Sequence, residues 1–344
     1  MFNYETKVYL LLNSDLIFYD KMKILALHLN NFLEYAQLRG LSREEMIRLI
    51  KNPPSDLQGE NATVEVLDFY SVVRFIMLSL KDELLGLRLG NLMNLKALGL
   101  IYQISLQATT IEEALFYLKS YLNSTFPIID IQTEVNKTYA SIILKIDNEY
   151  HAENVIILEN VLFIIGRELK IMAGNELSLN LYSPCYQSKY PLEWNKGNSF
   201  SLTFENRVLK ANFKNRIEWN LDILVPGYLK MIEELRQEKS FTTKVKIAIL
   251  SMAKPDLPNL ELVAEAFNIT PRTFQRRLDS ENTTFRVIIS EIKRKISYLL
   301  IGHKRFSVTE ISDILGFSEP ASFIHTFKKW YGNSPERFRQ QINR

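Results

Sequence analysis

Apolar positions recur with two different periods along the first two thirds of the chain. In five stretches they lie three and four residues apart, which predicts helices. In four others the period is that of strands, and Asn136-Lys137-Thr138 joins two of these as an antiparallel hairpin would require. Helices around a small set of strands indicate an α+β domain over residues 1–225. The expected helices cover residues 20–39, 42–50, 64–80, 109–122 and 153–172, and the expected strands cover 129–135, 139–146, 177–182 and 199–204.

From residue 241 onward the helical period continues, and turn residues alone interrupt it. Pro226-Gly227 indicates the edge of the first domain, so residues 226–240 are expected to form a linker. Residues 241–344 are then expected to form an all-α domain. Two helix-turn-helix motifs joined by a long helix are expected within it.

The first of these motifs is expected over residues 260–279. An apolar-striped helix ends at Asn268, because asparagine tolerates left-handed backbone geometry. Thr270 is expected to cap the next helix, with Pro271 as its first residue. Phe274 and Leu278 then face inward, while Arg272, Gln275 and Arg276 face outward.

The second motif is expected over residues 307–331. Ser307 and Glu310 have the spacing of a capping box, and Gly316 is expected to end the first helix. Ser318 is expected to cap the second helix, with Pro320 in its first turn. The apolar side of that helix is formed by Phe323, Phe327 and Trp330, and its polar side by Ala321, Ser322 and His325.

The charge distribution separates the two domains. The chain carries a net charge of only +3, but residues 241–344 hold 17 basic and 10 acidic residues, a net charge of +7. Residues 1–240 hold 25 and 29, a net charge of −4. A basic all-α domain attached to a mildly acidic domain is typical of a DNA-binding module with a separate sensing or assembly module.

The order of residues in the second motif is more specific than its helical pattern. Gly316-Phe317-Ser318, Phe327-Lys328-Lys329, Gly332, Ser334-Pro335 and Phe338-Arg339 occur at spacings that resemble the C-terminal signature of the AraC family of bacterial transcription regulators. The match runs without a gap from Ile311 to Arg339. The resemblance implies a double helix-turn-helix domain with a linker helix, here residues 285–301. It also implies double-stranded promoter DNA and RNA polymerase as partners.

The resemblance also places the expected DNA contacts. Arginine can grip guanine with two donors and glutamine can pair with adenine, so the first helix has the chemistry for base recognition. Many members of the family carry arginine where His325 stands, and we therefore expect the first helix to supply most of the specificity. The expected base-contacting residues are Arg272, Thr273, Gln275, Arg276, Pro320, Ala321, Ser322 and His325. Phosphate contacts are expected from Lys293, Arg294, Lys328, Lys329 and Arg337, each of which could equally be an ordinary surface charge.

The first domain resembles the effector domain of the ornithine-utilisation type of AraC regulator. The shared order comprises Gly40-Leu41-Ser42-Arg43, the segment from Gly86 to Gly90, Gly99-Leu100 and the helix that begins Glu112-Glu113-Ala114-Leu115. This domain type is called arabinose-binding-like, a label that does not establish a sugar ligand. The resemblance implies an effector-responsive activator that forms a homodimer. No effector-binding residue can be assigned, and a domain that only dimerises or binds a protein partner stays open.

An enzymatic role is the third alternative, since AraC-type domains are sometimes fused to alkyl-transfer repair modules. Such chemistry needs an activated cysteine and further metal ligands, whereas Cys185 is the single cysteine and no histidine stands at metal-ligand spacing to it. We therefore expect no catalytic activity, no metal and no cofactor. The absence of a signal peptide and of a long apolar run predicts a cytoplasmic protein without a membrane span.

Overall fold

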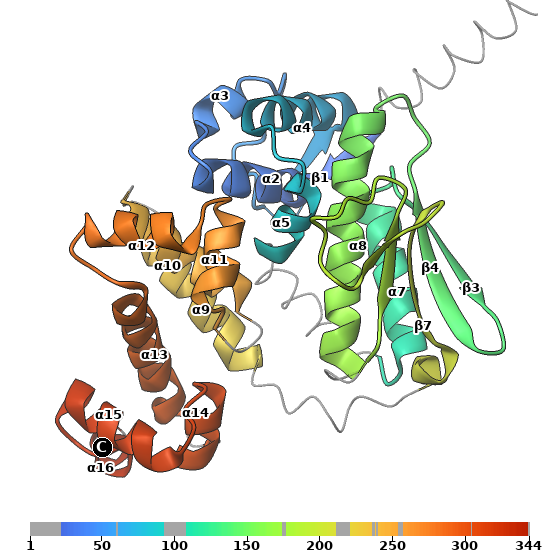
Figure 1. Cartoon of the computed structure of the whole chain (residues 1–344). Coiled ribbons are helices and arrows are strands. Elements are labelled where there is room, and N and C mark those ends of the chain that lie inside the picture. The colour runs from blue at the N-terminus through green and yellow to red at the C-terminus, as the bar shows by residue number, and fades with distance from the viewer. Residues whose placement is uncertain are drawn as a thin grey trace, which may run out of the picture. The chain divides into compact units, whose positions relative to one another are not determined.

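The computed structural model describes residues 22–59, 61–92, 108–173, 177–210, 221–235, 238, 240–253, 257–303 and 305–342. Contacts divide the chain into two compact units (Figure 1). The first comprises Met1–Gly90 and Ile104–Ile217, and the second comprises Asn91–Gln103 and Glu218–Arg344. Gly99-Leu100, part of the resemblance in the first domain, lies outside the described residues.

The first unit begins with a two-stranded sheet that the helical period did not predict. β1 (Lys23–Leu25) pairs antiparallel with β2 (Thr63–Glu65), so the two helices expected there start later than their apolar pattern does. The N–H of Ala26 also donates to the carbonyl of Ala62, at 2.7 Å. The helices of this unit are α2 (Ala26–Leu38), α3 (Arg43–Ile47), α4 (Val66–Leu80), α5 (Leu85–Leu92), α7 (Ile111–Thr125) and α8 (His151–Ala173).

Two helix starts in this unit test the capping predictions. Ser42 caps α3 as expected, since its side chain accepts from the N–H of Glu45. Helix α7 is capped by Thr110, one residue later than the expected start at Thr109, and the Thr110 hydroxyl accepts from the N–H of Glu113. The Glu113 carboxylate in turn accepts from the backbone N–H of Thr109. The start of α7 therefore has hydrogen bonds in both directions, but the capping residue lies one position later than predicted.

A five-stranded sheet in the order β3-β4-β7-β5-β6 forms the second half of the unit. The predicted hairpin is confirmed, with Val135 opposite Ala140. The sequence did not predict the short strand β6, which pairs in parallel with β5 and buries Trp194. Helix α8 runs along this sheet (Figure 1). The strands are β3 (Asp130–Val135), β4 (Tyr139–Lys145), β5 (Asn180–Ser183), β6 (Trp194–Lys196) and β7 (Phe200–Glu205), followed by the 3-10 helix η1 (Asn206–Lys210), and the α+β class is confirmed.

The Gly-Leu-Arg-Leu-Gly segment packs α5 directly on the backbone of α8. A Cβ atom on Gly86 would lie 2.7 Å from the carbonyl oxygen of Ile156, closer than such atoms can approach. A Cβ on Gly90 would lie 3.0 Å from Phe163. The two glycines therefore allow a close helix contact that any larger residue would push apart.

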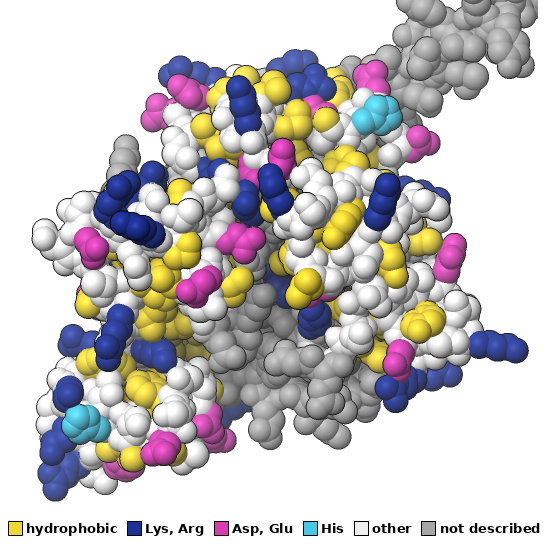
Figure 2. All heavy atoms as spheres, in the orientation of Figure 1, with side chains coloured by type: hydrophobic (Ala, Val, Ile, Leu, Met, Phe, Trp, Pro, Cys, Tyr) yellow, Lys and Arg dark blue, Asp and Glu magenta, His cyan; other side chains and the backbone are white. Residues whose placement is uncertain are grey.

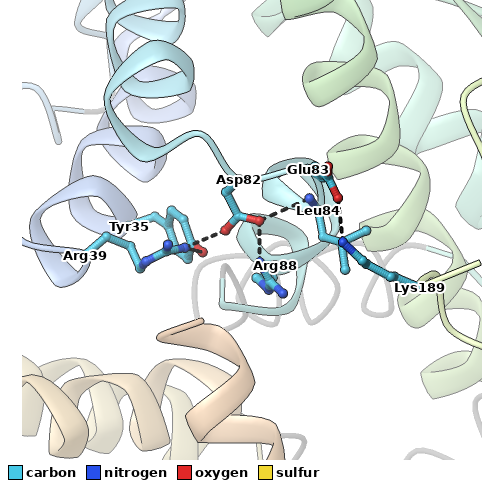
Figure 3. A network of polar contacts seen from close by, with 7 residues as sticks. All are labelled: Tyr35, Arg39, Asp82, Glu83, Leu84, Arg88 and Lys189. Atoms are coloured by element: carbon cyan, nitrogen blue, oxygen red, sulfur yellow. Dashed lines mark hydrogen bonds and ion pairs between the residues drawn. The ribbon is translucent and has the colours of Figure 1, made fainter. Parts of the chain in front are cut away.

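A buried charge network lies between the glycine segment and α2. The Asp82 carboxylate accepts from Arg39 at 2.6 Å, from Arg88, and from the backbone N–H of Leu84 at 3.1 Å (Figure 3). Arg39 also donates to the hydroxyl of Tyr35 on α2, at 2.6 Å. Burial disfavours the ionised carboxylate, but the hydrogen bonds from the two arginines outweigh burial, so the pKa of Asp82 lies below its ordinary value.

The second unit is all helical among its described residues, as predicted. Pro226 lies inside the first helix instead of interrupting the chain. The predicted boundaries at residues 225 and 240 stay a prediction, although the next helix does begin at the expected place, where Ser240 accepts from the N–H of Thr243. The helices are α9 (Leu221–Leu235), α10 (Phe241–Met252), α11 (Leu260–Ala266), α12 (Pro271–Asp279), α13 (Phe285–Gly302), α14 (Val308–Ile314), α15 (Pro320–Tyr331) and α16 (Pro335–Ile342).

In the part of the chain that the structure describes, no helix is both long and apolar enough to cross a bilayer.

Candidate nucleic-acid interface

The first helix-turn-helix consists of α11, a turn at Asn268 and α12. Asn268 adopts a left-handed conformation, with φ of +53°, as predicted for the turn. Thr270 caps α12 by accepting from the N–H of Thr273, and Pro271 occupies the first helical position. These local signals begin α12 where the sequence predicted.

A cluster of phenylalanine rings holds α12 against α10 and α11. Phe274 is fully buried, and its ring centroid lies 5.4 Å from Phe241 and 5.7 Å from Phe267. The carboxylate of Glu281, just after α12, accepts from the backbone N–H groups of Phe241 and Thr242 at the start of α10. Hydrogen bonds from Thr242 and Phe241 keep the pKa of Glu281 below its ordinary value. Helix α12 is therefore held at its centre by Phe274 and just beyond its C-terminal end by Glu281.

The outer face of α12 carries the predicted base-contacting side chains. Arg272, Gln275 and Arg276 are exposed. Thr273 is half-buried, and its hydroxyl oxygen accepts from the Thr270 hydroxyl at 3.0 Å, so this side chain belongs to the helix cap. Figure 2 shows Lys and Arg side chains gathered over α12. The sequence did not predict that Arg277 would lie over the ring of Phe241, 5.5 Å from its centroid.

The second helix-turn-helix consists of α14, a turn at Gly316 and α15. The capping box at its start is complete, because Ser307 and Glu310 each accept from the other's backbone N–H. The bonds from Ser307 lower the pKa of Glu310. Gly316 has a φ of +63°, the left-handed conformation predicted for the end of α14.

The predicted cap of α15 was wrong by one residue. Glu319, and not Ser318, occupies the N-cap position, and its side chain makes no capping hydrogen bond. Pro320 is the first helical residue, and its fixed φ defines the start of the helix without a capping side chain. Phe323 and Phe327 are fully buried as predicted, whereas Trp330 is half-buried.

The outer face of α15 offers less hydrogen-bonding capacity than that of α12. Ala321, Ser322 and His325 are exposed, and Pro320 is half-buried. One hydroxyl and one imidazole are the only polar side-chain groups among these four residues, since alanine and proline have none. Three of the four residues are exposed, but all four lack the two-donor chemistry of arginine.

Helix α13 places the two motifs at its opposite ends (Figure 1). It has 18 residues, so it spans about 27 Å at 1.5 Å per residue. Phe285 at its start packs edge-to-face with Phe274 of the first motif, and Tyr298 near its end packs edge-to-face with Phe338 of α16. One element thus sets the separation of the two exposed helix faces.

The predicted phosphate contacts divide into two groups. Arg294, Lys328, Lys329 and Arg337 are exposed. Lys293 is half-buried on α13, and its Nζ atom donates to the carbonyl of Gly316 at 3.4 Å. The same ammonium group lies 4.7 Å from the centroid of the Phe317 ring. Lys293 therefore points toward the turn of the second motif, which no spacing in the sequence could have indicated.

A groove of about 750 Å³ opens in the first unit, where β4 ends and β7 begins. Ile128, Ile129, Leu144 and Leu158 form its buried apolar floor. Polar and charged side chains follow its rim, namely Asn123, Asp130, Lys145, Asp147, Asn198 and Ser199. The volume falls within the range of small-molecule sites. The sequence carried no signal for it, because six separate segments contribute to the lining.

The single cysteine has surroundings that disfavour the thiolate. Cys185 is exposed, but partial desolvation of its thiol and the nearby Glu159 carboxylate raise its pKa. No group of three or more His, Cys, Asp or Glu side chains within the described residues is arranged to hold a metal ion. A nucleophilic cysteine would need the opposite electrostatic environment.

Two family profiles match the chain, one in each half. "Helix-turn-helix domain" matches residues 263–341, and "Arabinose-binding domain of AraC transcription regulator, N-term" matches residues 40–180. The chain is 20% identical over 316 residues to an ornithine utilization regulator of Pseudomonas aeruginosa, which covers 88% of this chain and 91% of that protein. It is 25% identical over 144 residues to the HTH-type transcriptional activator CfaD of Escherichia coli, covering 39% of this chain and 54% of CfaD. The crystal structure of transcriptional regulator CdpR from Pseudomonas aeruginosa aligns with 78% of this chain and 90% of that chain, with 19% identity and a TM-score of 0.35.

Proposed function

Because the chain belongs to the AraC family of transcription regulators, we propose that it recognises a single DNA site with α12 and α15 in adjacent major grooves. The protein is a DNA-binding transcription regulator. The observation that carries the two-groove proposal is the placement of one exposed polar helix face at each end of α13 within one compact unit.

The two helices contribute unequally in this proposal. Arg272, Gln275 and Arg276 on α12 make the base contacts that distinguish one sequence from another. Ser322 and His325 on α15 add weaker contacts, while Lys328, Lys329 and Arg337 neutralise phosphates and position the protein. Arg294 is a further phosphate contact, on the linker helix.

Bound DNA is expected to be bent toward the protein. The linker helix spans about 27 Å, but successive major grooves on one face of straight B-form DNA lie roughly 34 Å apart. Both helices can enter their grooves if the DNA curves and shortens that distance, which adds sequence-dependent deformability to recognition. A site selected from random DNA should therefore contain two elements about 10 base pairs apart.

The bend can be measured by energy transfer between dyes at the two ends of the selected duplex. Binding should raise the transfer efficiency, and scrambling the element that α15 contacts should abolish the rise. A bound duplex that stays straight would contradict the proposal, as would a selected site with a single element.

We propose that the first domain regulates the activity of the protein. We infer that it binds a small-molecule effector, that the protein acts as a homodimeric activator contacting RNA polymerase, and that it works in the cytoplasm, where bacterial DNA lies. The match to an arabinose-binding domain and the activator name of CfaD support these inferences. The groove between β4, β7 and α8 is the proposed effector site, since it combines a buried apolar floor with a charged rim.

The effector proposal predicts a stabilising ligand. Purified protein should be screened by thermal unfolding against amino acids, polyamines, sugars and fatty acids. A ligand at a hundred times its dissociation constant should raise the free energy of unfolding by about 2.7 kcal/mol. Ser199→Trp, which places an indole at the rim of the groove, should abolish the shift, and the hit should change affinity for DNA in the wild-type protein.

Ser71→Trp is the matched control, because Ser71 is exposed on α4 and does not line the groove. It should leave the ligand shift intact. A ligand that stabilises the Ser199→Trp protein as well would place the effector elsewhere. No stabilising ligand, together with intact sequence-specific DNA binding, would favour the alternative in which the first domain only dimerises or binds a protein partner.

A further inference from the structure

A lysine side chain of the linker helix contacts two residues in the turn of the second helix-turn-helix. The Nζ atom of Lys293 donates to the carbonyl oxygen of Gly316 at 3.4 Å and lies 4.7 Å from the centroid of the Phe317 ring. An ammonium group at this distance from an aromatic face is attracted by the ring's quadrupole. Both contacts fall on the segment that directly precedes α15.

That segment is in turn packed against α15. The ring of Phe317 lies 5.5 Å from the ring of Phe323 and 6.4 Å from that of Trp330, centroid to centroid. Phe323 follows directly after Ala321 and Ser322, which face outward. A displacement of Phe317 would therefore move the N-terminal half of α15, where the expected base contacts lie.

The opposite end of α15 has separate attachments. The Tyr331 hydroxyl donates to the backbone carbonyl of Arg294 at 2.8 Å. Arg339 on α16 donates to the carbonyls of Ile301 and Phe306, at 3.1 and 2.6 Å. These bonds hold the C-terminal end of α15 and the following helix to α13 and to the loop after it, whereas Lys293 contacts the turn at the N-terminal end of α15.

We propose that Lys293 is a positioning residue that fixes the orientation of α15 for insertion into the second major groove, instead of a phosphate contact. Lys293 is a half-buried residue, and its ammonium group is directed at the turn by an exposed hydrogen bond and a ring contact within the protein. The positioning role of Lys293 rests on the proposed binding of α15 to a second groove. The experiment below distinguishes a failure of the positioning role from a failure of the two-groove proposal.

A phosphate-contacting lysine and a positioning lysine predict different effects of salt on DNA affinity. A phosphate contact releases a counterion on binding, so its removal lowers the slope of log K against log salt by about 1, and it weakens binding to all sequences alike. A positioning residue makes no contact with DNA. Its removal should leave the slope unchanged and should weaken binding only where the second helix has specific contacts to lose.

The experiment uses the full-length protein and two duplexes, one with both elements of the selected site and one with the second element scrambled. Lys293→Met removes the ammonium group but keeps the length of the side chain. We expect it to bind the complete site about tenfold more weakly, to bind the scrambled duplex like the wild type, and to keep the wild-type salt slope. Lys293→Arg, which retains a cation able to contact both a carbonyl and an aromatic ring, should keep at least half of the affinity.

Lys328→Met is the matched control, because Lys328 is exposed on α15 and is an expected phosphate contact. It should weaken binding to both duplexes by the same factor and lower the salt slope by about 1. A Lys293→Met protein that behaves like this control, or like the wild type on both duplexes, would overturn the positioning role.

Two further outcomes keep the result decisive. If scrambling the second element leaves the wild type unaffected, the two-groove proposal itself fails and Lys293 has no such role. If Lys293→Met lowers the thermal midpoint of the protein, the smaller change Lys293→Gln takes its place. A Lys293→Gln protein that loses affinity for the complete site, but not for the scrambled duplex, would still support the positioning role. An equal loss for Lys293→Gln on both duplexes would contradict it.

Discussion

Replacing Arg272 and Arg276 together with alanine is expected to weaken binding to the protein's specific DNA site by about 2–6 kcal/mol, because each arginine can make a bidentate base contact worth about 1–3 kcal/mol. Both side chains are exposed on the outer face of α12, while Phe274 and Leu278 hold the helix in place from its inner face. The substitution should therefore leave the thermal midpoint unchanged. Affinity is best measured by titration at fixed salt, since phosphate contacts make every value salt-dependent.

The matched control is the double substitution Ser322→Ala with His325→Ala, on the corresponding face of α15. We expect a loss of less than about 2 kcal/mol, since one hydroxyl and one imidazole are removed and neither can make the two-donor contact of arginine. In the Arg272→Ala, Arg276→Ala protein, base preference should relax at the DNA element that α12 contacts. In the Ser322→Ala, His325→Ala protein, it should relax at the element that α15 contacts. A larger loss for the α15 pair would show that the assignment of specificity to α12 is wrong.

Asp82→Ala is expected to lower the free energy of unfolding of the first domain by about 3–5 kcal/mol, because it leaves two buried arginines without their common counter-ion. The Asp82 side chain is 1% exposed, and Arg39 and Arg88 are only 9% and 15% exposed (Figure 3). The loss should appear as a lower midpoint in thermal or urea unfolding. Glu83→Ala is the neighbouring control, since Glu83 pairs with Lys189 at the surface and should contribute less than about 1 kcal/mol.

The same carboxylate predicts how stability depends on pH. The pKa of Asp82 is lower in the folded protein than in the unfolded chain, so its contribution is present above the unfolded value of about 4 and is lost as pH falls through the folded value. Asp82→Asn imitates the protonated form. The difference in midpoint between the wild type and Asp82→Asn should therefore narrow when pH is lowered below about 4, and a difference that stays constant would mean that the charge of Asp82 contributes nothing.

The amino-acid sequence alone determined the local features of the DNA-binding domain. The cap at Thr270, the capping box of Ser307 and Glu310, and the left-handed turns at Asn268 and Gly316 depend on residues at most four positions apart. Short-range hydrogen bonds and backbone preferences depend on residues that are close in the sequence, so such spacings predict them. The order of residues from Ile311 to Arg339 also sufficed to indicate the family, which the helix-turn-helix profile supports.

Only the tertiary structure decided the features that depend on distant residues. The pairing of β1 with β2 joins segments about 40 residues apart, where the apolar pattern predicted helix. Strand β6 forms by pairing with the edge of β5. Asp82 lies 43 positions from Arg39 in the chain, and Lys293 lies 23 positions from Gly316, so their roles as counter-ion and attachment point were invisible in sequence spacing. The groove of the first unit likewise has a lining from several strands and helices. Burial and long-range contacts are set by packing, and packing depends on the whole chain and not on neighbouring residues.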